Sequence, residues 1–144
     1  MNKLEKRFHR VMGGMIGNES LAASLDDDAA SELFSWGQAT AKTIVDETDG
    51  LDDSAAEEHM APRLRALRLM MRAIGRWTGE ANNLDARSRS MLWARVAEQA
   101  RVVFGDTFVL PAMDEVLAQL PSGASAGQVV MWLKTLFEER KPKG

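Results

Sequence analysis

One stretch decides the fold class of this chain: residues 62–77, which read PRLRALRLMMRAIGRW. Its apolar side chains recur at spacings of three and four residues, which places them on one face of an α-helix; they are Leu64, Leu67, Met71 and Ile74. The arginines recur at the same spacings and form a stripe on the opposite face: Arg65, Arg68, Arg72 and Arg76. The stretch therefore predicts an amphipathic helix with an apolar core face and an arginine face.

Helix signals also occur on both sides of this stretch. Leu4, Phe8 and Met12 recur at a spacing of four and predict a short basic helix over residues 3–12. Further helices are predicted over residues 29–46, 86–104, 112–120 and 126–139, with a short turn at 55–60 that Pro62 separates from the main helix. Ser54, Asp85 and Ser125 are the predicted N-caps. No stretch alternates strictly, so the predicted fold is all-α, a single-domain bundle of five or six helices.

Charge is divided sharply along the chain. Residues 1–18 are basic and predict an amphipathic N-terminal arm, which either docks on the domain or contacts a membrane surface or nucleic acid. Residues 19–61 contain twelve acids and one cation, whereas residues 62–101 contain nine arginines, no lysine and three acids. These two segments and the C-terminal helices of 111–139 make up a helical domain over 19–139, followed by a basic tail over 140–144.

The overall composition excludes several classes of protein. The chain has 144 residues and no cysteine, which excludes disulfides, thiolate catalysis, zinc ribbons and iron–sulfur clusters. No apolar run approaches the roughly 20 residues that span a bilayer. We therefore expect a cytoplasmic protein without a membrane span.

The arginines support three interpretations. They pair with the acids of residues 26–28 and 46–58, inside the molecule or in a homodimer; they bind the phosphates of RNA or DNA; or they recognise an acidic protein surface. Trp77 and Trp93 lie at core spacing and are expected to pack in the core; near the arginines, they could stack on bases if they were exposed. The predicted phosphate-binding residues are Arg65, Arg68, Arg72, Arg76, Arg87, Arg95 and Arg101.

The layout of residues 59–139 resembles the small helical subunit of type III CRISPR effector complexes. The matching features are Arg63-Leu64-Arg65, the helix from Arg87 to Phe104, and a closing helix around Trp132, Leu136 and Phe137. They cover somewhat over half of the chain. The resemblance implies a non-catalytic RNA-binding role beside other subunits.

Candidate sites for metals and catalysis do not satisfy the spacing that their chemistry needs. An EF-hand loop with Gly50 at its sixth position puts Val45 first and Ala56 twelfth, where oxygen ligands are required. His59 follows Glu57 and Glu58 directly, which does not place three ligands on one helical face. We therefore expect no catalytic residue, no metal and no cofactor. The leading prediction is an RNA-backbone-binding subunit of a ribonucleoprotein, and the alternative is a structural or adaptor protein, including a homodimer.

Overall fold

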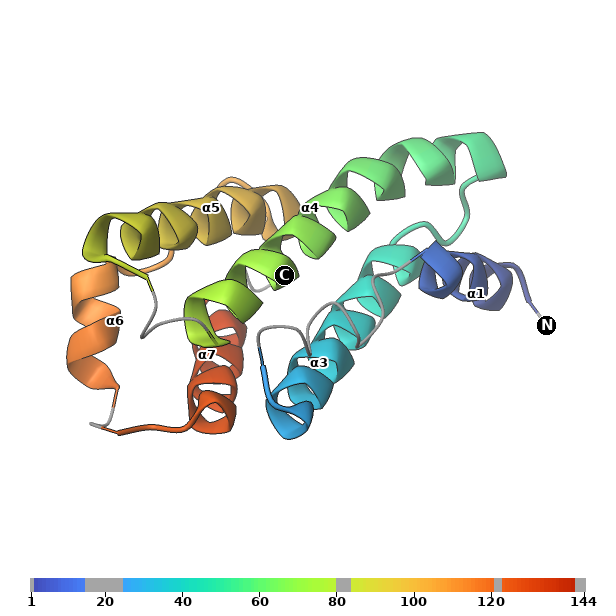
Figure 1. The fold of residues 1–144 in the computed structure, drawn as a ribbon. Helices are drawn as coiled ribbons and strands as arrows, with labels where there is room; N and C mark the ends of the chain where they lie inside the picture. The colour runs from blue at the N-terminus through green and yellow to red at the C-terminus, as the bar shows by residue number, and fades with distance from the viewer. Residues whose placement is uncertain (1, 15–24, 80–83, 121–122, 142–144) are drawn as a thin grey trace.

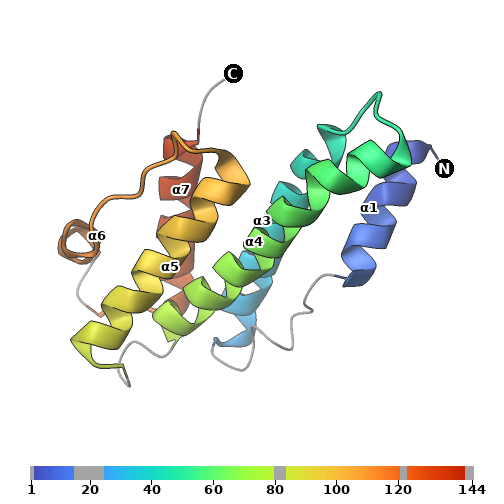
Figure 2. The ribbon, with the colours of Figure 1, turned by 90° about the horizontal axis from the view of Figure 1, so that it is seen from above.

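The computed structural model describes residues 2–14, 25–79, 84–120 and 123–141, and these residues form a bundle of helices without a strand. Six helices are described: α1 (Lys3–Gly14), α3 (Asp27–Asp46), α4 (Asp53–Gly79), α5 (Ala86–Phe104), α6 (Met113–Gln119) and α7 (Ala126–Arg140). The all-α prediction is confirmed. α4 packs against α3 on one side and α5 on another, with α1 and α6 at opposite ends of the bundle (Figures 1 and 2).

Side-chain caps begin α3, α5 and α7. Asp26 accepts a hydrogen bond from the Ala29 N–H at 2.8 Å, and Asp85 accepts one from the Ser88 N–H at 2.7 Å. Ser125 and Gln128 form a reciprocal capping box at the start of α7. The caps predicted at Asp85 and Ser125 are therefore confirmed. Gly105 ends α5 with a φ of 107°, a conformation that favours glycine.

Two predictions about the start of α4 are wrong. The helix begins at Asp53, and the Asp52 carboxylate, rather than Ser54, accepts the hydrogen bond of a first-turn N–H, that of Ala55 at 2.8 Å. Pro62 does not divide the helix, which runs through it without interruption. Ala56 and Met60, before the proline, are buried in the core, so continuing the helix keeps their apolar surface out of water. This burial offsets the hydrogen bond that Pro62 cannot donate.

Aromatic residues fill the core on both sides of α4. Trp36, Phe104, Phe108 and Phe137 form one cluster, in which the Phe104 and Phe108 ring centroids lie 4.9 Å apart. Trp77 of α4 packs on Trp93 of α5, with a centroid separation of 4.9 Å. Both of these tryptophans are at most 5% exposed, so they pack in the core as their spacing predicts and the condition for stacking on bases is not met. They join the two helices instead.

Close packing between α3 and α4 depends on Gly37. This residue is buried where α3 faces Met71, and a Cβ at position 37 would overlap the end of the Met71 side chain. The absence of a side chain lets Met71 lie against the α3 backbone. This contact places Met71, on the core face of α4, directly against α3.

Candidate binding surface

Helix α4 presents its arginines on the side away from the core. Leu67, Met70, Met71 and Ile74 are at most 2% exposed. Arg65, Arg72 and Arg76 are exposed, and Arg68 is half-buried at the edge of the stripe. The predicted separation of core face and arginine face is therefore present in the structure.

Helix α5 does not carry its arginines in one row. Arg87, Arg95 and Arg101 are all exposed. Arg101 follows Arg95 by six residues, which is about 240° around a helix at 100° per residue, so the two face different sides. Arg95 instead shares a face with Met91, one turn earlier, and with Val102, two turns later.

A shallow depression joins the arginines of the two helices. Its volume is about 190 Å³, and it is lined by Arg76 of α4 and by Leu84, Ser88, Met91, Leu92 and Arg95 in and before α5. Arg76 and Arg95 therefore belong to one continuous surface, on which Arg72 and Arg65 follow Arg76 along α4. Arg87 and Arg101 do not line this depression.

Apolar side chains are interleaved with these arginines. Leu69, which lies one turn from both Arg65 and Arg72, is 38% exposed. On α5, Met91 is 58% and Val102 is 46% exposed. We call this surface the α4–α5 face and define it by Arg65, Leu69, Arg72, Arg76, Met91, Arg95 and Val102. It combines cations with accessible apolar area.

Several carboxylates that could have paired with the exposed arginines of α4 and α5 have other partners. Glu47 pairs with Arg63, and Asp53 pairs with Arg7. Asp26 and Asp85 cap helices. In the described ranges, no salt bridge involves Arg65, Arg72, Arg87, Arg95 or Arg101. The pairing of these five arginines with acids 26–28 or 46–58 inside one molecule is therefore not observed there.

Arg63 belongs to the same arginine block but has a structural role. Its Nε and Nη2 donate to the Val103 carbonyl at 3.1 and 2.9 Å, near the C-terminus of α5. Its Nη1 donates to Glu47, and His59 Nε2 lies 3.4 Å from the same carboxylate. Partial burial raises the pKa of Glu47, but hydrogen bonds and charge from Arg63 and His59 outweigh it and hold the pKa below its usual value. Arg63 therefore ties together α4, the end of α3 and the end of α5.

The helical phase of Arg63 indicates this role. It lies three residues after Met60 and four before Leu67, both of which are buried, so it stands at the margin of the core face rather than on the stripe. The network also accounts for His59, which contacts Glu47 and Arg63.

Arg7 is a second arginine whose role sequence reasoning missed. It is only 3% exposed and enters the turn between α3 and α4. Nη1 donates to the Thr48 carbonyl and hydroxyl, both at 3.0 Å, and Nη2 donates to the Leu51 carbonyl at 2.7 Å. Arg7 lies three residues after Leu4 and four before Val11, which places it on the apolar face of α1. This spacing was the sequence signal that Arg7 is buried.

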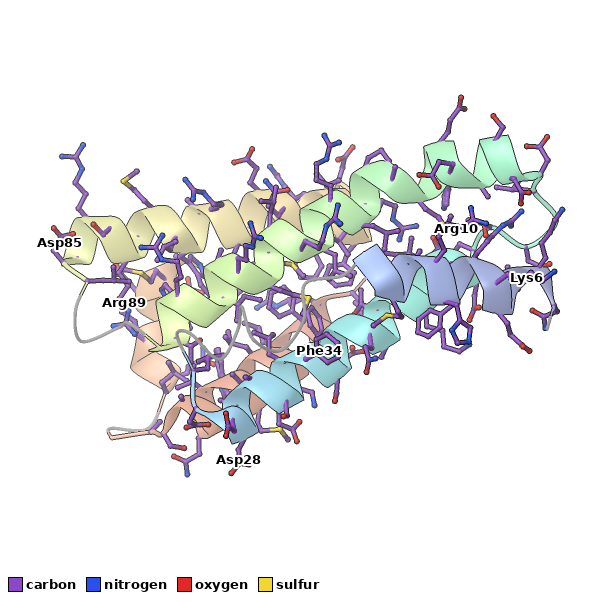
Figure 3. All side chains as sticks on the ribbon, turned by 45° about the vertical axis from the view of Figure 1, so that its right-hand side comes forward. Lys6, Arg10, Asp28, Phe34, Asp85 and Arg89 are labelled. Carbon is purple, nitrogen blue, oxygen red and sulfur yellow. The ribbon has the colours of Figure 1, made fainter. Side chains whose placement is uncertain are left out.

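The basic arm thus docks on the domain through Arg7, with α1 packed against α3. Two other cations of α1, Lys6 and Arg10, are exposed and are labelled in Figure 3, which also shows many side chains projecting from α4 and α5. A contact of this arm with a membrane surface or nucleic acid stays a prediction.

Neither a metal centre nor a membrane span is found in the part of the chain that the structure describes. No three His, Cys, Asp or Glu side chains there are grouped so that they could hold a metal ion. No described helix is both long and apolar enough to cross a bilayer.

Comparisons with known proteins do not assign the chain to a family, since no protein-family model, curated protein or solved structure matches it. The resemblance to the small subunit of type III CRISPR effector complexes stays a prediction.

Proposed function

We propose that this protein is a non-catalytic binding module whose α4–α5 face binds an acidic protein surface. The observation that carries the proposal is the interleaving of exposed arginines with Leu69, Met91 and Val102 on that face. Arginine and methionine are enriched at protein–protein interfaces, where apolar contacts supply affinity and charges supply orientation. A partner with carboxylates around an apolar strip complements both features.

A second copy of this chain, docked face to face, is a poor partner for this surface. A two-fold dimer presents the same patch from both subunits, so the arginines of one copy would face those of the other. Like charges brought together in this way oppose association. A homodimer therefore needs a different, acidic surface of the second copy.

RNA-backbone binding is the second candidate, as a subunit of the kind that the CRISPR resemblance implies. It is favoured by the exposed guanidinium groups of Arg65, Arg72 and Arg95, which form no salt bridge to a described residue. Phosphates neutralise such groups with a steep dependence on salt. The buried positions of Trp77 and Trp93 weigh against it, because neither indole is available to stack on a base.

Fluorescence anisotropy with the full-length protein separates the two candidates. The probes are a labelled amphipathic peptide of Glu and Leu and a labelled single-stranded RNA, each at about 50 and 200 mM salt. We expect the peptide to bind, and the double variant Arg72→Glu, Arg95→Glu to lose that binding. Arg101→Glu is the control, since Arg101 is exposed on another side of α5.

The outcomes lead to different conclusions. If RNA binds with a steep salt dependence and the peptide does not, the second candidate replaces the first. If neither probe binds at the lower salt concentration, both readings of the α4–α5 face are wrong.

A further inference from the structure

We infer that the depression between Arg76 and Arg95 receives one apolar side chain of an acidic partner helix, with carboxylates one turn before and after it. This inference rests on the proposed function. It adds the place where the partner is anchored and the sequence pattern that the partner helix must carry.

The depression has an apolar base and a cationic rim. Leu92 is only 6% exposed and lies at the base, and the half-buried Leu84 and exposed Met91 add further apolar surface. Its volume of about 190 Å³ corresponds to roughly six molecules of liquid water at about 30 Å³ each. A single aliphatic side chain would therefore displace several waters, part of them from the apolar surface of Leu84, Met91 and Leu92, which favours binding.

The rim gives the partner its charge pattern. The guanidinium groups of Arg76 and Arg95 come from different helices and line the same depression. On a partner helix, residues three or four positions before and after the anchor lie on the same face, within reach of both groups. Arginine binds carboxylates in a planar, bidentate manner, so a glutamate at one of those positions would pair with Arg95 while the anchor enters the depression. A second glutamate would lie beside Arg76, which also has an interaction within the protein.

The side chain of Met91 suits such an anchor. It is unbranched and polarizable, so it can repack around side chains of different shape. Its 58% exposure leaves apolar area that a partner would cover. The residues that carry most of the affinity of an interface cluster in well-packed, desolvated pockets near its centre, and a filled depression would be such a place.

Two labelled helical peptides of roughly 20 residues test the inference with the full-length protein. Both carry Glu one turn before and one turn after a central position, which is Leu in the first peptide and Ala in the second. We expect the Leu peptide to bind at least about tenfold more tightly, because a hydrophobic pocket distinguishes side chains of different size by about that factor or more.

Variants of the protein locate the anchor. Ser88→Phe fills the depression and should abolish the preference for Leu, whereas Ser90→Phe, an exposed position two residues away on the same helix, should preserve it. Met91→Lys removes apolar wall without filling the space and should reduce the preference. Circular dichroism spectra confirm that each variant folds.

Each outcome is decisive for one of the two claims. Equal binding of both peptides, or a Leu preference that survives Ser88→Phe and Met91→Lys, overturns the anchor while leaving the proposed function standing. Failure of both peptides to bind refutes the proposed function itself. If Ser88→Phe blocks a single-stranded RNA oligonucleotide and leaves the peptides unaffected, the depression binds nucleotides and the inference is wrong.

Discussion

Replacing Arg7 by methionine should lower the free energy of unfolding by about 2–3 kcal/mol. The change removes the guanidinium that links α1 to the turn between α3 and α4 through Thr48 and Leu51. A hydrogen bond to a charged group contributes roughly 1.5–3 kcal/mol, and a buried acceptor left unpaired costs about 1–3 kcal/mol. Thr48 is fully buried, so its carbonyl would lose its donor without gaining water. The ion pair with Asp53 adds little, since that carboxylate is 72% exposed.

Urea unfolding followed by tryptophan fluorescence measures this change. Arg10→Met is the matched control, because Arg10 is exposed on the same helix, and it should alter stability by less than about 0.5 kcal/mol. Arg7→Lys should recover little, since one ammonium group cannot reproduce the fork that reaches both Thr48 and Leu51. If Arg7→Met and Arg10→Met unfold at the same urea concentration, the reasoning about this buried arginine is refuted.

Three further predictions concern stability. The pKa of Glu47 is lowered in the folded state, so its ion pair with Arg63 stabilises the protein above pH 4.5 and is lost as pH falls through the lowered pKa. Glu47→Gln should therefore be less stable than the wild type near neutral pH by about 0.5–1 kcal/mol, with the two unfolding curves converging in acid; a constant gap would contradict this. Ser125→Ala should cost about 1 kcal/mol by removing the capping box of α7, measured in urea against Ser90→Ala, which caps no helix. Gly37→Ala should change stability by less than about 1 kcal/mol, because it displaces only the flexible end of Met71 while alanine gains about 0.5–1 kcal/mol of helix propensity. In a double-mutant cycle with Met71→Ala the same change should become stabilising, and additive effects would exclude the Met71 contact as a cost.

Periodicity and caps were sufficient to predict most of the fold. The arginine stripe of α4 and the ends of α5 and α7 follow from spacing and from Asp85, Gly105 and Ser125, because these signals are local. The course of α4 through Pro62 was not predictable, since it depends on apolar surface that Ala56 and Met60 bury against distant residues. At Pro62, tertiary packing therefore outweighed the local preference of proline for the start of a helix.

The roles of individual arginines were less predictable than their spacing. Arg7 and Arg63 are bound to backbone carbonyls that lie 41 and 40 residues away in the chain, and no local pattern reveals such partners. The depression likewise joins Arg76 to Arg95 across two helices. The spacing of the arginines therefore predicts the charged face but does not separate its exposed arginines from Arg63, which holds three helices together.

The contact of Arg7 with Thr48 also constrains how the protein is assembled during translation. The two residues are 41 positions apart, and ribosomes add about 5–20 residues per second, so α1 is made roughly 2–8 s before the turn that receives its guanidinium exists. During that interval the Arg7 guanidinium has no turn to enter, although α3, against which α1 packs, is made before Thr48. Docking of α1 through Arg7 therefore completes only after the α3–α4 turn has formed.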